Sequence, residues 1–344
     1  MRRPTMKAAV LTQPGHFEVR DVSVPECGPD DVLVKVARVG ICGTDVHMFR
    51  GHYAADRLPL VPGHEFSGTV AEVGGSVSTV ALGQRVIADI NIGCGHCFYC
   101  RKNEVMSCAQ VRQLGIHVDG AFAEYVKVPQ RLVIPIPDGM PFEVAALTEP
   151  LACTVRAAKK SSIRLGESVL VIGAGPIGNL HVQVARAIGA APVIAADLNV
   201  DRLALAASCG ADVTVSDMSR LDAEVRAVTD GRGADVVIES VGLPKLYERA
   251  FDLVRPGGRI AAFGLADAAA RASFAPQSVV LREIGVKGSV AAMGDDMHEA
   301  LTLLRFGRID VGPFLRESRD LDQVQDAIEA FAGDPGILKM QIVI

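Results

Sequence analysis

The sequence predicts an α/β protein with two domains, one mainly β and the other built on a parallel sheet. The chain has 344 residues, which is longer than one hydrophobic core usually extends. Residues 6–137 contain short apolar runs separated by glycine and proline turns, a pattern typical of β-strands. Further along, β-branched runs alternate with amphipathic helical segments, which indicates a parallel sheet covered on both faces.

In the mainly β region, each apolar run is expected to form one strand. These runs are 7–11, 16–22, 31–39, 66–74, 85–89, 121–128 and 132–136. Residues 141–161 then change to helical spacing and contain Pro150, where we expect the helix to break. We therefore assign residues 1–152 to the first domain.

The second region begins with the strand 168–173 and alternates regularly as far as a last strand at 284–290. Residues 153–291 are therefore assigned to the second domain. Two amphipathic helices, 296–306 and 321–333, and a strand at 337–344 follow. We expect residues 292–344 to return to the first domain.

Charge and hydropathy exclude several classes of partner. Lysine and arginine total 35 against 40 acidic residues, a net charge of −5, and neither sign forms blocks. A nucleic-acid or polybasic membrane surface is therefore not expected, and a small molecule is the expected partner. The N-terminus has no apolar run of signal-peptide length, and no segment has the apolar length of a membrane span, so we expect a cytoplasmic protein.

A glycine motif, "VIGAGPIGN", follows the first strand of the second domain and opens a helix. Gly173, Gly175 and Gly178 have the order G-x-G-x-x-G, with Pro176 and Ile177 between them. Such glycines permit a tight turn and a close approach of the backbone to a pyrophosphate, which the helix N-terminus attracts. In this strand, turn and helix context, the motif predicts dinucleotide binding.

Asp197 ends the next strand, 19 residues after Gly178, where a carboxylate can accept hydrogen bonds from the adenosine ribose. It would repel a 2′-phosphate, and Leu198 and Asn199 offer no cation, so NAD is preferred over NADP. Arg202 either stacks on adenine or is a solvated helix residue.

Four of the eight cysteines form the comb C-x2-C-x2-C-x7-C, in the segment 93–108. Four thiolates from one short loop match tetrahedral zinc, and a closed shell of four sulfurs leaves no position for a substrate. A thioredoxin-like redox role lacks the required strand-to-helix setting, whereas an iron–sulfur cluster stays an alternative. We predict structural zinc on Cys94, Cys97, Cys100 and Cys108.

A second, dispersed set of residues can hold a catalytic metal. The candidates are Cys42 and His47 in "GICGTDVH", His64 and Glu65 in "VPGHEFSG", and Glu149 in "LTEPLACT". A thiolate, an imidazole and a carboxylate would fill three positions of a zinc tetrahedron and leave the fourth open. Spacing alone does not show that they meet.

In their order and separation, these motifs resemble the zinc-dependent medium-chain dehydrogenase/reductase superfamily, in its sorbitol (polyol) and threonine dehydrogenase branch. The resemblance covers nearly the whole chain. It implies a GroES-like catalytic domain and a Rossmann cofactor domain, with two zinc ions per chain and NAD. It also implies catalytic zinc on Cys42 and His64, with Glu65 or Glu149 as the third protein ligand.

The resemblance further implies a role for residues around the metal and the cofactor. Zinc lowers the pKa of the substrate hydroxyl, and a hydride goes to the nicotinamide. Thr44 takes the hydroxyl proton and passes it through the cofactor ribose towards His47 and solvent. By the same resemblance, Lys339 is implied to contact a cofactor phosphate. The residues implied near the nicotinamide are Phe263, Gly264, Leu265, Ser289 and Val290.

The predicted function is hydride transfer from a secondary alcohol or polyol to NAD. Where sorbitol dehydrogenases have an aromatic residue and an arginine–tyrosine pair that hold the polyol, this chain has Met48 and Ala291–Ala292. A threonine-like amino-alcohol or a 2,3-diol dehydrogenase is therefore an alternative. A non-catalytic dinucleotide-binding or structural protein is the alternative from another class. A homo-oligomer, a dimer or a tetramer, is expected by the same resemblance.

Overall fold

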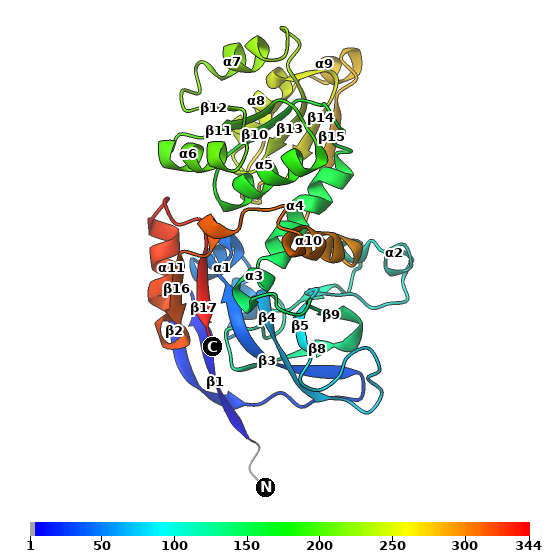
Figure 1. Ribbon diagram of the computed structural model, residues 1–344, viewed down its shortest axis with the longest axis vertical. Helices are drawn as coiled ribbons and strands as arrows, with labels where there is room; N and C mark the ends of the chain where they lie inside the picture. The colour runs from blue at the N-terminus through cyan, green and yellow to red at the C-terminus, as the bar shows by residue number, and fades with distance from the viewer. Residues whose placement is uncertain (1–3) are drawn as a thin grey trace. The chain divides into compact units, whose positions relative to one another are not determined.

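The structure, a computed structural model, describes residues 4–344 and divides the chain into two compact units (Figure 1). Unit 1 holds the chain up to Ala152, then Ala292–Phe306 and Val311–Ile344, and unit 2 holds Cys153–Ala291 and Gly307–Asp310. The piece Gly307–Asp310 lies outside the expected second domain. Gln183 holds it in unit 2, because its side chain accepts from Asp310 N at 2.6 Å and donates to Asp310 O at 3.1 Å.

Unit 1 is mainly β. A seven-stranded sheet has the order β16 (Glu317–Asp320), β17 (Met340–Val343), β3 (Asp31–Gly40), β4 (Glu65–Val73), β5 (Arg85–Ala88) and β9 (Val133–Pro135), with β8 (Tyr125–Pro129) also paired to β3. Two small sheets pair β1 (Thr5–Gln13) with β2 (His16–Ser23) and β6 (Asn91–Ile92) with β7 (Arg112–Gln113). The C-terminal strand β17 runs antiparallel to β3, so the last residues complete a sheet that begins near the N-terminus (Figure 1).

Short helices connect and cover these strands. The α-helices of unit 1 are α1 (Gly43–Phe49), α2 (Phe98–Arg101), α3 (Phe142–Ala145), α10 (Asp295–Arg305) and α11 (Val324–Gly333), and α4 (Thr148–Lys160) continues into unit 2. The 3-10 turns are η1 (Ala55–Arg57), η2 (Val105–Ser107), η3 (Gln130–Leu132), η4 (Gly312–Phe314) and η5 (Leu321–Gln323).

The expected helix break at Pro150 is wrong. Pro150 lies in the first turn of α4, and the interruption falls before Thr148, between α3 and α4. A proline is tolerated in a first turn because the N–H that it lacks would have no partner inside the helix.

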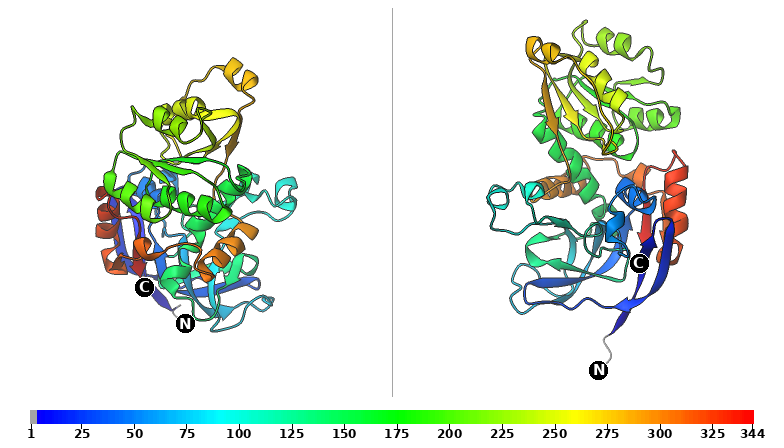
Figure 2. Two further views of the ribbon diagram at one scale, coloured as in Figure 1. Left: turned by 45° about the horizontal axis from the view of Figure 1, so that its top comes forward. Right: turned by 180° about the vertical axis from the view of Figure 1, so that it is seen from behind.

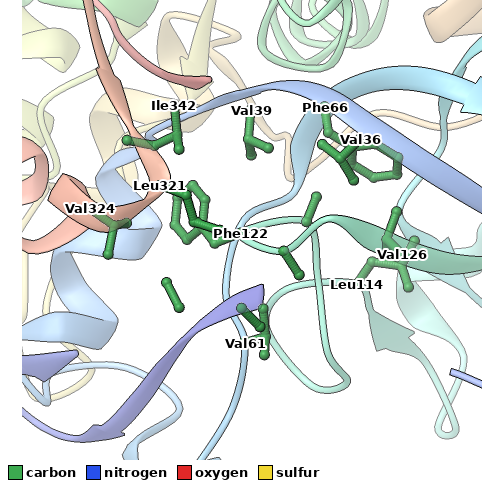
Figure 3. Packing of buried hydrophobic residues seen from close by; sticks show 14 of the residues in the cluster. Val36, Val39, Val61, Phe66, Leu114, Phe122, Val126, Leu321, Val324 and Ile342 are labelled. Carbon is green, nitrogen blue, oxygen red and sulfur yellow. The ribbon is translucent and has the colours of Figure 1, made fainter. Parts of the chain in front are cut away.

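The core of unit 1 joins segments that are far apart in the chain. Figure 3 shows Phe122 among apolar side chains that include Val39 of β3, Leu321 of η5 and Ile342 of β17. Phe122 and Ile342 are completely buried. The C-terminal elements are therefore part of the hydrophobic core that supports β3 and β4.

Unit 2 is a six-stranded parallel sheet with helices packed on its strands (Figures 1 and 2). The order is β12 (Val213–Val215), β11 (Val193–Ala196), β10 (Val169–Ile172), β13 (Ala234–Glu239), β14 (Val254–Ala262) and β15 (Gly285–Gly288). The helices are α5 (Pro176–Ile188), α6 (Val200–Ser208), α7 (Leu221–Ala227), α8 (Pro244–Leu253) and α9 (Pro276–Leu281).

The predicted fold class is confirmed. The strand order reverses between β10 and β13, and the loop after β10 therefore lies at the switch point where open parallel sheets bind ligands. Among residues 4–344, none of the helices combines the length and the apolar character that a membrane crossing requires.

Candidate active site

Three candidate metal ligands meet in unit 1 because β3 and β4 are neighbours. Gly40 at the end of β3 pairs with Glu65 at the start of β4, and Cys42 follows two residues later as the N-cap of α1. One ligand atom each of Cys42, His64 and Glu65 lies within 4.8 Å of the others, and His64 and Glu65 are buried. Sulfur, imidazole and carboxylate donors at this spacing fit a catalytic zinc ion with one position left for a further ligand.

Asp45, which the sequence analysis did not single out, supports this cluster from α1. Its Oδ1 lies 3.5 Å from Nδ1 of His64, and its Oδ2 accepts a hydrogen bond from the N–H of Cys42 at 2.8 Å. Burial by itself would lower the pKa of His64, but Asp45 and Cys42 raise that pKa well above its ordinary value. A carboxylate on one ring nitrogen fixes the orientation in which the other nitrogen can bind a metal.

Lys339 closes the other side of the cluster. It is buried just before β17, its Nζ forms an ion pair with Glu65, and it donates to Ile41 O at 3.1 Å. Burial would lower the pKa of Lys339, but Glu65, Cys42 and Glu149 raise it. Its partners in the structure are these protein groups, and the contact with a cofactor phosphate that the resemblance implied stays a prediction.

Glu149, the other candidate carboxylate, is buried in the first turn of α4. It is close enough to act on the charge of Lys339. Within residues 4–344, the three-residue cluster contains Glu65 and does not include Glu149.

Thr44 and His47 lie three residues apart on α1 and therefore near one face of this helix. Thr44 is half-buried near the N-terminal end, and His47 is exposed in the last turn. Partial burial, followed by the positive charges of His52 and Arg50, lowers the pKa of His47 below its ordinary value. A neutral imidazole at the exposed end of the helix can accept a proton and release it to water.

The four-cysteine set lies in the loop between β6 and β7, which we call the lobe (residues 93–108). A Cβ at Gly93 would lie 2.8 Å from the Sγ of Cys100, so a glycine is required there. Cys94 and Cys100 have their sulfurs 3.9 Å apart. The four sulfurs all lie within 4.8 Å of one another, and they belong to Cys94, Cys97, Cys100 and Cys108.

Backbone N–H groups point at these sulfurs. The N–H of Cys97 donates to Cys94 Sγ at 3.4 Å, and the N–H of Cys100 donates to Cys97 Sγ at 3.4 Å. Hydrogen bonds from the N–H groups of His96 and Cys97 lower the pKa of Cys94 to about 6. Four converging cysteine sulfurs, two of which accept these N–H bonds, fit a closed tetrahedral zinc site.

In unit 2, the glycine loop has the close packing that its spacing predicts. Gly173 has a φ of 96°, and a Cβ at Gly178 would lie 1.8 Å from Gly173 O. The buried side chain of Asn179 donates to Ala174 O at 2.5 Å and so holds the loop against the first turn of α5. Helix α5 begins at Pro176, with Ile177 next, and its N-terminus offers N–H groups to an anion.

Asp197 follows β11 and contacts the same loop. Its Oδ2 accepts from the N–H of Ala174 at 2.7 Å, and its Oδ1 accepts from the N–H of Asn199 at 2.8 Å. The guanidinium of Arg202 lies beside Gly175. A Cβ added to that glycine would be 3.8 Å from the Nη1 of Arg202. Asp197 and Arg202 therefore both border the loop.

The residues assigned to the nicotinamide follow the carboxyl ends of β14 and β15. The N–H groups of Phe263 and Gly264 donate to Glu239 O at 3.1 and 2.8 Å, and the N–H of Ser289 donates to Ala262 O at 3.1 Å. Because all strands are parallel, Leu265 and Val290 lie at the same edge of the sheet as the glycine loop. Both side chains are exposed.

The sequence analysis missed three supporting residues, Asp45, Asn179 and Glu239. The buried carboxylate of Glu239 accepts from the N–H of Gly242 at 2.9 Å and so shapes the turn after β13. For Asp45, a signal existed, since it stands three residues after Cys42 in "CGTD", where a carboxylate can cap a helix. For Asn179 and Glu239, nothing in the local pattern pointed to a loop contact.

Two family models match the chain. The alcohol dehydrogenase GroES-like domain matches residues 28–138, and the zinc-binding dehydrogenase model matches residues 176–305. The chain therefore belongs to the zinc-dependent medium-chain dehydrogenase/reductase superfamily, and the predicted resemblance is confirmed. It is a zinc-binding dehydrogenase of the alcohol and polyol type.

Individual relatives cover almost the whole chain. An L-threonine 3-dehydrogenase of Mesorhizobium japonicum is 36% identical over 97% of this chain and 98% of its own length. A D-arabitol-phosphate dehydrogenase of Enterococcus avium is 36% identical over 94% of each chain. The solved structure of a zinc-binding dehydrogenase from Sinorhizobium meliloti 1021, bound to NADP, is 35% identical, with a TM-score of 0.91 over 99% of this chain and 100% of that chain.

Proposed function

We propose that this chain oxidises a secondary alcohol or polyol with NAD, using a catalytic zinc ion held by Cys42, His64 and Glu65. The observation that carries the proposal is the cluster of these three donors, of which His64 and Glu65 are buried, supported by Asp45 and Lys339. Glu149 lies near the same charges and is proposed as the second carboxylate of the site. Cys94, Cys97, Cys100 and Cys108 would hold the second zinc ion, in a structural role.

A zinc ion held there would supply a lowered pKa for the alcohol hydroxyl, and a bound nicotinamide would serve as acceptor for the hydride of the carbinol carbon. The hydroxyl proton then needs an acceptor. The half-buried hydroxyl of Thr44 would accept this proton while its own O–H proton passes on, through the cofactor ribose, towards the exposed His47, which would release a proton to water. The net products are a ketone, NADH and one proton.

The dinucleotide would bind at the carboxyl edge of the parallel sheet in unit 2. The glycine loop and the N-terminus of α5 suit the pyrophosphate, and Asp197 suits the ribose hydroxyls of NAD. The position of Arg202 beside Gly175 makes NADP the competing cofactor, and the Sinorhizobium relative was solved with NADP. Phe263, Gly264, Leu265, Ser289 and Val290 are proposed to lie near the nicotinamide.

The substrate class is the main question for experiment. Initial rates of NADH formation should be measured over a panel of sugar alcohols, 2,3-diols, threonine and simple secondary alcohols, each with NAD and with NADP. We expect turnover with a polyol or secondary alcohol and NAD. A threonine-like activity is the second candidate, because a threonine 3-dehydrogenase is 36% identical over nearly the whole chain. If no alcohol is oxidised by the protein with zinc bound, the proposed function is wrong.

We also propose a cytoplasmic homo-oligomer, a dimer or a tetramer. Within residues 4–344 the structure has no disulfide between cysteines, which suits a reducing compartment. The strand β15 ends the order of the parallel sheet, and the exposed side chains of Val280, Leu281, Val286 and Val290 lie on or near it. Because an apolar sheet edge favours pairing with another chain, we expect association there, and light scattering after gel filtration measures the mass.

A further inference from the structure

The chain enters unit 1 from unit 2 through a short buried stretch that two polar side chains hold. We call residues 292–296 the crossing segment, because Ala291 is in unit 2 and Ala292 is in unit 1. Ala292 and Met293 are buried, and Ala291 has a φ of 54°, which few residues other than glycine adopt. A backbone bent in this way requires contacts that hold it.

Asn91 makes the first of these contacts. Its Nδ2 donates to Ala292 O at 2.7 Å and to Asp89 Oδ1 at 2.7 Å, and its Oδ1 accepts from Nε2 of Gln113 at 2.9 Å. The residue is only 2% exposed. A buried amide whose donors and acceptor are all used has one favourable orientation, because leaving any of these groups unpaired would cost free energy.

Asp89 makes the second contact. Its Oδ2 accepts from the N–H of Gly294 at 3.2 Å, while its Oδ1 accepts from both the N–H and the side chain of Asn91. The segment is therefore bound at Ala292 and again at Gly294 by a linked pair of buried groups. Within the segment, the N–H of Met293 donates to Asp296 Oδ2 at 3.2 Å.

The same pair stands at the base of the lobe. Asn91 pairs with Gln113 across β6 and β7, the two strands that enclose residues 93–108. Asn91 is three residues before Cys94, and Gln113 is five residues after Cys108. A Cβ on Gly294 would lie 3.8 Å from Nδ2 of Asn103 in the lobe, and Figure 1 shows α10, which follows the segment, next to the lobe with α2.

We propose that Asn91 and Asp89 are positioning residues that couple the four-cysteine lobe to the crossing segment. A lobe closed by its metal fixes the β6–β7 pair, and this keeps the Asn91 amide against Ala292. The crossing segment in turn fixes the backbone of Ser289 and Val290, which precede it directly. The effect on dinucleotide binding rests on the proposed function of Ser289 and Val290, whereas the anchoring of the segment does not.

Hydrogen exchange of the full-length, zinc-loaded chain tests the anchoring. In Asn91→Leu we expect the amides of residues 289–296 to exchange about tenfold faster, the effect of losing a buried hydrogen bond. Asp89→Asn provides a second variant, because it keeps an acceptor for Asn91 but presents an N–H to Gly294. Gln110→Ala, at an exposed position just beyond the lobe, is the matched control and should leave these amides unchanged.

Anchoring is ruled out if residues 289–296 exchange as in the wild type in both variants. It is also ruled out if Gln110→Ala accelerates them equally. Faster amide exchange over the whole chain in both variants would mean general destabilisation. This result would also count against a specific anchor.

Two further readouts test the coupling and its effect on the cofactor. Cys97→Ser, which removes one lobe thiol, should accelerate exchange at 289–296, and unchanged exchange there would refute coupling to the lobe. In Asn91→Leu, KM for NAD should rise about fivefold with kcat within about twofold, because a positioning residue does not touch the reacting atoms. An unchanged KM would refute the effect on the cofactor. If the wild type turns over no NAD at all, the proposed function fails, and the exchange data still decide the anchoring.

Discussion

The two candidate metal sites of unit 1 are built in opposite ways. The lobe takes its four sulfurs from one loop, Cys94 to Cys108, and three of the four cysteines are only half-buried. The dispersed set takes its donors from the end of β3 and the start of β4, and His64 and Glu65 are fully enclosed. The lobe can therefore assemble from local chain geometry, whereas the dispersed set exists only when β3 and β4 are paired in register.

The two sites also differ in their donor atoms. Four sulfurs fill the coordination of a zinc ion, while one sulfur, one nitrogen and one oxygen leave a position for an alcohol. The difference teaches that the loop with the most thiols is the site that has no position for an alcohol. Under the proposed function, the chemistry belongs to the set that the fold brings together, and the lobe has a structural role.

The largest effect is expected from breaking the dispersed set. Cys42→Ser should lower kcat/KM by about a thousandfold, because a catalytic metal supplies several kcal/mol of transition-state stabilisation. Steady-state rates measure this, and circular dichroism shows whether the fold is kept. Cys27→Ser, a half-buried thiol of unit 1 outside both sets, is the matched control and should behave like the wild type. A Cys42→Ser enzyme with more than about a tenth of the wild-type rate would contradict the role of this thiolate.

Breaking the lobe should act on stability first. Cys97→Ser should lower the free energy of unfolding by about 3 kcal/mol or more, since binding of a structural zinc ion contributes directly to folding. Urea titration followed by fluorescence or circular dichroism measures this change. At a temperature where the variant is folded, kcat should stay within about threefold of the wild type. An abolished kcat in a folded variant would give the lobe a chemical role.

A smaller effect is expected from changing Asp45, which supports the dispersed set. Asp45→Asn keeps the shape of the side chain but removes the charge that faces His64, so the affinity for the catalytic zinc should fall about 10- to 100-fold. Competition with a chelator measures the affinity. Asp119→Asn, which removes the charge of another carboxylate of unit 1 that accepts the N–H of Val61, is the control. Equal zinc affinities in Asp45→Asn and the wild type would show that Asp45 does not orient His64.

The smallest effect concerns the proton path. The pKa of His47 is lowered below its ordinary value of 6.5, so its neutral form persists to lower pH, and activity should fall as the pH decreases through that pKa. His47→Gln should remove this acidic limb and lower kcat/KM about tenfold on the plateau above it. The pH profile of kcat/KM in both proteins is the measurement. An acidic limb that persists unchanged in the variant would assign it to another group.

The features that could be predicted from the sequence are those encoded within a few residues. The four cysteines of the lobe and the glycine loop each have a spacing that indicates their local geometry. The structure brings the atoms of each motif together locally. The alternation of strands and helices predicted the parallel sheet, whose inner strands β10 and β11 are buried on both faces. The last strand was expected to return to the first domain, and its antiparallel pairing with β3 supplies the physical reason.

The contacts that could not be predicted join residues that are far apart in the chain. Lys339 meets Glu65 only because β17 lies beside β3, and Asn91 meets Ala292 only because the chain re-enters unit 1 at the base of the lobe. Glu65 lies beside Cys42 and His64 because of the β3–β4 register, which sequence spacing does not contain. Pro150 was misread because its position within the helix, and not its presence, decides whether the helix breaks.

The most direct test of two sites with different roles is to follow zinc content and activity together during slow removal of metal by a chelator. The wild type should start with two zinc ions per chain, lose activity with one of them, and keep its fold until the other is removed. Cys42→Ser should start with a single zinc ion and remain folded. Two results would contradict the division of roles. One is a wild-type chain that holds a single zinc ion and still holds it in Cys42→Ser. The other is that activity and fold are lost together when the same ion is removed.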